Sequence, residues 1–241
     1  MKKIAIILAG GIGRRFNVKT PKQFVDIENK PLIIHTLEKF ENNLKVDEII
    51  VVCLNSYIQI LTDMIKTYGI SKVVDVISGG DTRHQSIRNA VNYLAYKHPK
   101  NTKIIIHNAN MPLVTQKNIN ECFEKCLGKD TIVTTAAICD GFFYEKMNGN
   151  NQLSIGPDRN DILHAKVPEA LYLSTALNLY NDEELFDKKY ESYTAGMLGI
   201  IKNKVVVPVI CESTNKKITT MEDYYFIQTH LRKEKENEQQ M

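Results

Sequence analysis

The stretch Ile7–Phe24, ILAGGIGRRFNVKTPKQF, places a glycine-rich loop directly after an apolar run that begins at Ile4, and it decides the fold. The apolar run predicts a buried first strand. Glycines at positions 10, 11 and 13 let backbone N–H groups approach an anion closely. Two arginines and two lysines follow in the same stretch, and the side chains of the arginines and of one lysine can reach a polyphosphate. A phosphate-binding loop behind a first strand is therefore expected.

Two common glycine-rich loops do not fit this stretch. The dinucleotide-binding fingerprint needs a third glycine where the chain has Phe16. The P-loop needs Gly-Lys followed by Ser or Thr, but Gly13 is followed by Arg14 and Arg15. A nucleotidyltransferase loop remains, and a plain turn with solvated basic side chains stays open as the alternative on this evidence alone.

Composition limits the class of protein. The chain has 241 residues, 43% of them hydrophobic, which is enough to bury the core of one large α/β domain or of two small ones. No linker-like stretch divides it, so we expect a single domain spanning residues 1–241. Its 31 basic and 28 acidic side chains are too balanced to predict a nucleic-acid or membrane partner, and no apolar run approaches the roughly 20 residues of a membrane span. The five cysteines show no CxxC spacing, so we expect a reduced, cytoplasmic protein without a disulfide framework or a zinc site.

Short apolar runs alternate with longer segments of helical period, a pattern typical of βαβ units around a mainly parallel sheet. Strands are predicted at residues 3–9, 48–53, 72–78, 103–107, 131–138 and 204–210. Helices are predicted at residues 31–40, 56–69, 82–97, 115–128, 174–188 and from 220 onward, with a charged tail at 232–241 that frays. The fold class is therefore α/β.

The pattern changes after Asp140. Residues 140–162 form two aromatic and polar segments around a Gly-Asn turn cluster, which predicts a projecting hairpin rather than another helix. We place this arm at about residues 139–168.

The opening stretch resembles the signature loop of the cytidylyltransferases that activate methylerythritol 4-phosphate or ribitol 5-phosphate with CTP. Four further motifs resemble that family in the same order: GGDTRHQSIRNAV from Gly79, IIHNANMP from Ile105, DRNDILHAKVPE from Asp158 and TNKKITTMEDYYFIQTHL from Thr214. The resemblance implies a three-layer α/β/α Rossmann-like nucleotidyltransferase fold with a mainly parallel mixed sheet. It also implies a homodimer that exchanges the β-arm.

The resemblance implies a role for each matching residue. The CTP-binding residues that it implies are Ala9, Gly10, Gly11, Gly13, Gly80, Arg83 and Ser86. The catalytic cations that it implies, which neutralise the triphosphate, are Arg15, Lys22 and Lys217. Arg159 matches an arm residue that reaches the acceptor phosphate in the neighbouring subunit. Mg²⁺ is the implied cofactor, because a divalent cation suits a triphosphate substrate.

This chemistry explains a site made of cations. In nucleotidyl transfer an oxygen of the acceptor phosphate attacks the α-phosphorus and pyrophosphate leaves, so the protein mainly positions the substrates and stabilises negative charge. No protein nucleophile is needed. His107 is therefore predicted to be a hydrogen-bonded structural residue.

The chain departs from the family pattern at the metal and acceptor ends. Asn108 and Met111 stand where the family usually has an aspartate that ligates the metal and an arginine. Asn108 is thus a neutral, weaker candidate ligand for Mg²⁺. We expect a cytidylyltransferase that transfers CMP from CTP to a polyol or sugar phosphate, with the acceptor left open. The alternatives are a CTP-binding regulatory protein without turnover and, remotely, a nicotinamide-dependent oxidoreductase.

Overall fold

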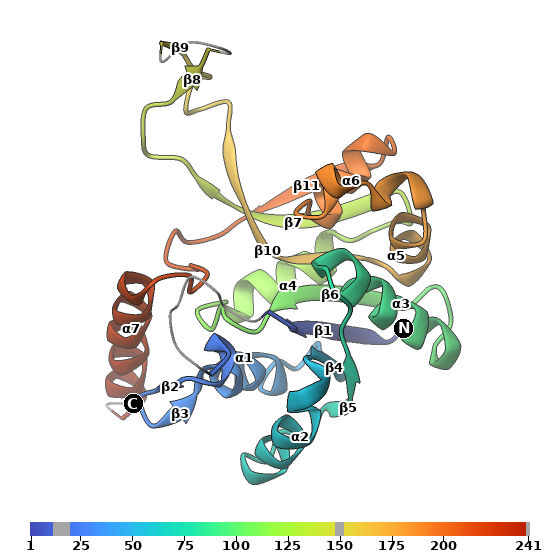
Figure 1. Ribbon diagram of the computed structural model, residues 1–241, viewed down its shortest axis with the longest axis vertical. Coiled ribbons are helices and arrows are strands. Elements are labelled where there is room, and N and C mark those ends of the chain that lie inside the picture. Colours follow the sequence, from blue (N-terminus) through green and yellow to red (C-terminus); the bar gives the residue numbers. More distant parts are fainter. Residues whose placement is uncertain (12–19, 148–151, 240–241) are drawn as a thin grey trace.

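A seven-stranded mixed sheet, in the order β11-β7-β10-β6-β1-β4-β5, forms the centre of the protein (Figure 1). The computed structural model describes residues 1–11, 20–147 and 152–239. The sheet strands are β1 (Lys3–Ala9), β4 (Glu48–Cys53), β5 (Val73–Ser78), β6 (Lys103–Asn108), β7 (Thr131–Ile138), β10 (Leu163–Tyr172) and β11 (Val205–Ile210). Only β10 runs antiparallel to its neighbours among these strands. The mainly parallel α/β fold is therefore confirmed.

Helices cover both faces of the sheet (Figure 1). The first layer consists of α1 (Leu32–Glu41), α2 (Ile58–Thr67) and α4 (Gln116–Lys125). The second layer consists of α3 (Arg83–Lys97), α5 (Leu173–Tyr180) and α6 (Ala195–Ile201). Strand β1 shows why two layers are needed: Ala5 and Ile7 belong to one core and Ile4 and Ile6 to the other, because side chains alternate across a strand.

The last helix, α7 (Met221–Gln239), packs beside the small hairpin of β2 (Asp26–Ile27) and β3 (Lys30–Pro31). A third apolar cluster joins Ile27 to Ile227 and Leu231. The prediction that the tail frays from residue 232 is wrong, because Arg232 pairs with Glu28 and the helix continues to Gln239.

No helix in the described part of the chain is both long enough and apolar enough to cross a bilayer.

Two other sequence predictions need correction. The helix predicted at 174–188 ends at Tyr180, and a separate 3₁₀ turn follows at Glu183–Phe186, where the Asp182 side chain accepts from the Glu184 N–H. The inner part of the segment assigned to the arm belongs to strand β10 of the main sheet, because Leu163, His164 and Ala165 pair with β7. Helix α6 was not predicted.

The arm itself rises from the sheet on the extensions of β7 and β10 (Figure 1). Its tip carries β8 (Tyr144–Lys146) and β9 (Leu153–Ile155), which pair antiparallel, as the hairpin prediction requires. The Gly-Asn turn cluster of the predicted hairpin lies at residues 148–151, outside the described residues.

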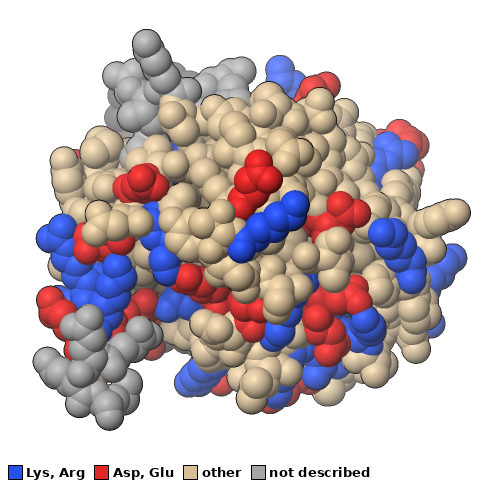
Figure 2. Space-filling view, turned by 90° about the horizontal axis from the view of Figure 1, so that it is seen from below, with Lys and Arg blue, Asp and Glu red and all other residues tan. Residues whose placement is uncertain are grey.

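On the face seen from below, basic and acidic side chains are interspersed rather than segregated by sign (Figure 2).

Candidate active site

A cavity of about 530 Å³ opens at the carboxyl ends of the central strands. The chain order reverses here: β1 lies between β4, which follows it, and β6, which the chain reaches only after β5. The ends of parallel strands diverge at such a switch point and leave room for a ligand. The cavity is lined by Leu8, Ala9, Gly10, Gly11, Lys22, Gln23, Leu54, Gly80, Asp81, Thr82, Arg83, Ser86, Asn108, Ala109, Asn110 and Lys217.

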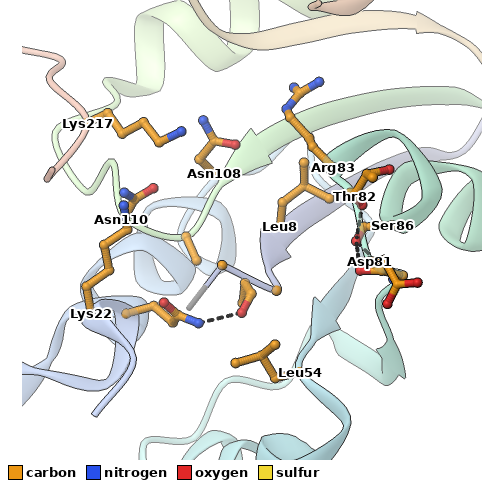
Figure 3. Close-up of a pocket in the computed structure, with 16 residues that line it drawn as sticks. Leu8, Lys22, Leu54, Asp81, Thr82, Arg83, Ser86, Asn108, Asn110 and Lys217 are labelled. Atoms are coloured by element: carbon orange, nitrogen blue, oxygen red, sulfur yellow. Dashed lines mark hydrogen bonds between the residues drawn. The ribbon is translucent and has the colours of Figure 1, made fainter. Parts of the chain in front are cut away.

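The amino end of α3 forms one wall of this cavity (Figure 3). Thr82 caps the helix, its hydroxyl accepting from the Gln85 N–H at 3.1 Å. The Ser86 hydroxyl accepts from the Gly80 N–H at 3.1 Å and donates to the Thr82 carbonyl at 2.9 Å. Both bonds tighten the loop, so the partial positive charge of a 15-residue helix faces the cavity.

Glycine is required at position 80 because of this tight loop. A Cβ added to Gly80 would lie 2.5 Å from the Cβ of Gln85.

On the opposite side, Gln23 Nε2 donates to the carbonyl of Ala9 at 2.6 Å and fixes the end of β1. Gln23 is a supporting residue that the sequence analysis missed, although it lies within the opening stretch.

The cations Lys22 and Lys217 enter the cavity from opposite ends of the chain. Lys22 Nζ donates to the carbonyl of Ile218 at 2.9 Å, and Asn110 Nδ2 donates to the same oxygen at 2.8 Å. The Ile218 N–H returns a bond to the Asn110 carbonyl at 3.1 Å. The side chain of Lys217 extends toward Asn108 (Figure 3). The C-terminal segment is thus fastened to the 3₁₀ turn Lys22–Phe24 beside the cavity.

Arg83 lies between the first cavity and a second one of about 680 Å³. Its Nη1 donates to the carbonyl of Tyr193 at 3.2 Å. The second cavity shares five lining residues with the first: Asp81, Thr82, Arg83, Asn108 and Lys217. It adds residues of β10 and of the C-terminal segment: His164, Ala165, Lys166, Val167, Lys216, Thr219 and Asp223. The two cavities are therefore adjoining parts of one site.

The residues around Asn108 determine how this site could bind a metal ion. Asn108 Nδ2 lies 3.5 Å from the Met111 sulfur as a weak donor, which leaves its amide oxygen as a possible ligand. Asp81 is the acidic side chain among the described residues that line the first cavity. Within the described ranges no cluster of three or more His, Cys, Asp or Glu side chains could hold an ion. These residues fit an ion that takes most of its ligands from a bound triphosphate.

His107 is not among the described residues that line either cavity. It is fully buried in β6, and its Nε2 donates to the Met111 carbonyl at 2.9 Å. Burial lowers the pKa of His107 from 6.5 to about 4, so the ring is neutral at physiological pH. The prediction of a structural histidine is confirmed.

The structure distributes the residues predicted from the family resemblance in three ways. Nine of them line the first cavity: Ala9, Gly10, Gly11, Lys22, Gly80, Arg83, Ser86, Asn108 and Lys217. Gly13 and Arg15 lie outside the described residues. Arg159 lies on the arm, 5.5 Å from the centre of the Phe142 ring, and lines neither cavity.

Comparison with known proteins agrees with this geometry. The model of the 2-C-methyl-D-erythritol 4-phosphate cytidylyltransferase family matches residues 3–233. The chain belongs to this family. A ribitol-5-phosphate cytidylyltransferase of Lacticaseibacillus paracasei is 31% identical over 230 residues, covering 95% of this chain and 97% of that protein.

Members of this cytidylyltransferase family with a different named acceptor are also similar. The 2-C-methyl-D-erythritol 4-phosphate cytidylyltransferase of Lachnoclostridium phytofermentans is 29% identical over 233 residues, covering 96% of this chain and 97% of that protein. The crystal structure of 4-diphosphocytidyl-2C-methyl-D-erythritol synthase from Anaerococcus prevotii superposes with a TM-score of 0.80 at 21% identity, covering 96% of this chain and 98% of that one. The family assignment makes the chain a nucleotidyltransferase, as the sequence predicts, and nothing supports the regulatory or oxidoreductase alternatives.

Proposed function

We propose that the protein transfers CMP from CTP to a polyol phosphate and releases pyrophosphate. Ribitol 5-phosphate is the favoured acceptor because relatives about 30% identical over nearly the whole chain are named for it. One observation carries the proposal: a glycine loop, a helix amino end and the cations Lys22, Arg83 and Lys217 meet in one cavity that opens into a second. In this proposal the first cavity takes the nucleotide and the second takes the phosphorylated acceptor, and Arg83 and Lys217 lie where the two cavities meet.

CTP is assigned to the first cavity. Gly10 and Gly11 present backbone without side chains, and the amino end of α3 supplies partial positive charge for a phosphate or a polar base edge. The hydrogen bonds that join the Ser86 hydroxyl to Gly80 and Thr82 fix the shape of the pocket here. A pocket of fixed shape penalises a larger purine base.

The acceptor is assigned to the second cavity because of its basic side chains. Lys166 of β10 and Lys216 of the C-terminal segment both line it, beside the shared Arg83 and Lys217. Burial lowers the pKa of Lys166, and the charge of Lys216 lowers it further. A phosphate dianion between the two ammonium groups would replace this repulsion with attraction. Three acidic side chains, Asp81, Glu191 and Asp223, also line this cavity, so the assignment rests on the pairing of Lys166 with Lys216 and not on the net charge of the lining.

The reaction needs no protein nucleophile. An oxygen of the acceptor phosphate forms a bond to the α-phosphorus of CTP, the bond from that phosphorus to the bridging oxygen breaks, and pyrophosphate carries away the electron pair. Lys22 and Lys217 stabilise the negative charge that develops on the phosphoryl oxygens. Arg83 holds the two substrates in register, since it borders both cavities.

Mg²⁺ is proposed as the cofactor. Asn108 would hold it through its amide oxygen, with phosphate oxygens and water as the remaining ligands. When bound, the ion would neutralise charge on the triphosphate.

A homodimer formed through the arm is also proposed. Large apolar side chains on the arm are exposed, with Phe142 at 86% and Ile155 at 91%. A second copy would bury them. It would also bring Arg159, which lines neither cavity of its own chain, near a neighbouring acceptor site. Sedimentation of the wild type and of Ile155→Asp tests this: the account expects a dimer that the charge converts to monomer, and a monomeric wild type would rule it out.

A reducing cytoplasmic location is proposed from the thiols. The five cysteines are unpaired, and Cys53, Cys122, Cys126 and Cys211 are buried. Burial raises the pKa of Cys53 to about 11, so this thiol is unreactive.

The proposed function is tested by pyrophosphate release with CTP, Mg²⁺ and a panel of phosphorylated polyols. Thermal shifts with the four nucleoside triphosphates provide a parallel measurement of base selectivity. Release with ribitol 5-phosphate and a larger shift with CTP than with ATP or GTP would support the proposal. Equal shifts for all nucleotides together with no release would reject it.

A further inference from the structure

Glu169 is a fully buried carboxylate in the centre of β10. Its two oxygens accept hydrogen bonds from consecutive backbone groups, the Ala195 N–H at 3.0 Å and the Gly196 N–H at 2.8 Å. These bonds fasten the beginning of α6 to the sheet. They compensate only part of the cost of burying a carboxylate, because a buried charge also requires an opposite charge.

Arg83 supplies that opposite charge. Its Nη2 lies 3.9 Å from Glu169 Oε2, while Nη1 donates to the carbonyl of Tyr193. The guanidinium is thus held by the sheet and by the segment just before α6. Its side chain keeps 23% of its surface exposed and faces both cavities.

We propose that Glu169 is a positioning residue that fixes the Arg83 guanidinium at the boundary between the CTP and acceptor cavities. The inference rests on the proposed function, which gives Arg83 its substrates. Without the Glu169 charge, the flexible arginine side chain would sample several rotamers, and the two substrates would lose their alignment. The free energy of unfolding alone would not reveal this role.

The chain offers a matched control in Glu41. Its carboxylate also accepts from two consecutive backbone groups, the Ser71 N–H at 3.0 Å and the Lys72 N–H at 2.8 Å. Glu41 is not among the described residues that line either cavity. Glu41 is less buried than Glu169, so Glu41→Gln controls for the loss of two such backbone hydrogen bonds and not for burial.

The test compares Glu169→Gln, Glu41→Gln, Arg83→Ala and the double variant Glu169→Gln/Arg83→Ala. Glu169→Gln should lower kcat by about 10-fold or more and change the KM for CTP by less than about 3-fold, because misplacing a positioned group costs mainly turnover. Glu41→Gln should lose some stability but keep both constants. The double variant should be no slower than Arg83→Ala, because Glu169 acts through Arg83.

The same four variants are tested for CTP binding by calorimetry, which does not require turnover. Arg83→Ala should weaken binding, and adding Glu169→Gln should weaken it no further. Multiplicative losses in the double variant, or equal kinetic losses in Glu169→Gln and Glu41→Gln, would overturn the inference. A wild type that binds CTP but releases no pyrophosphate would reject the proposed function instead, and the role of Glu169 would then be decided by whether Glu169→Gln weakens CTP binding more in the presence of Arg83 than in its absence.

Discussion

Lys22 and Ile218, which are 196 positions apart in the chain, are joined by a hydrogen bond from Lys22 Nζ to the Ile218 carbonyl at 2.9 Å. Lys217, the neighbour of Ile218, lines the same cavity as Lys22. The bond therefore sets the spacing of two cations that the sequence carries at opposite ends. A cavity that must stabilise a spread negative charge benefits from cations fixed in advance.

Replacing Lys22 with alanine should affect turnover more than CTP binding. Removal of an oriented group that stabilises transition-state charge typically lowers turnover by about 100-fold or more. The lost bond to Ile218 should reduce the free energy of unfolding by only about 1 kcal/mol. Steady-state kinetics and CTP calorimetry measure the two effects. Lys30→Ala is the control, since Lys30 pairs with Glu38 and lines neither cavity. Unchanged turnover in Lys22→Ala would make Lys22 a structural residue.

The buried His107 predicts how stability depends on pH. Its pKa is about 4 in the folded protein and 6.5 when unperturbed, so between these values the unfolded chain binds the extra proton. Stability from this group is complete above the upper value and falls as pH decreases toward the lower one, by roughly 3 kcal/mol in total. Urea unfolding of the wild type and His107→Gln over this range measures the slope. The glutamine variant should show the shallower dependence, and identical slopes would show that His107 does not titrate in this way.

The sequence predicts six of the seven strands of the main sheet and nine of the residues that line the first cavity, because these depend on local pattern. The apolar run of β1 and the glycines behind it are adjacent in the chain, and the cap at Thr82 follows from the motif that begins at Gly79. Strand β10 was missed because polar residues precede it and because its pairing with β6 and β7 is a long-range contact.

The supporting residues of the site were harder to predict for the same reason. Glu169 looks like an ordinary surface residue in sequence, and only the fold brings it to Arg83 and to the start of α6. Lys166 likewise carries no local signal for the second cavity, which forms where β10 meets the C-terminal segment.

The neutral residue at position 108 should make the enzyme demand more metal. Asn108→Asp adds a charged oxygen with little change in side-chain size, so the Mg²⁺ concentration for half-maximal rate should fall. The rate at saturating Mg²⁺ need not rise. A Mg²⁺ titration of pyrophosphate release compares the wild type with Asn108→Asp. The same metal dependence in both would mean that Asn108 does not contact the ion.

Lys166 should govern the affinity for the acceptor rather than for CTP. Lys166→Gln removes one charge from the second cavity, and the KM for the phosphorylated polyol should rise by about 10-fold, since a charge-assisted hydrogen bond contributes roughly 1.5–3 kcal/mol. The KM for CTP should stay within about 2-fold, because Lys166 is not among the described residues that line the first cavity. Lys66→Gln is the control, because Lys66 is exposed on α2. An unchanged acceptor KM in Lys166→Gln would place the acceptor phosphate elsewhere, with Arg159 of a neighbouring arm as the next candidate.

The central claim is that CMP, and not phosphate or pyrophosphate, passes from CTP to a polyol phosphate. Parallel reactions with CTP labelled at the α-phosphorus or at the γ-phosphorus test it most directly. Each reaction contains Mg²⁺ and an equal mixture of ribitol 5-phosphate and 2-C-methyl-D-erythritol 4-phosphate. The account predicts that the α label enters a CDP-polyol, mainly CDP-ribitol by mass, while the γ label leaves entirely as pyrophosphate. A γ label in the acceptor product, or an α label that remains in CTP while both substrates are bound, would contradict it.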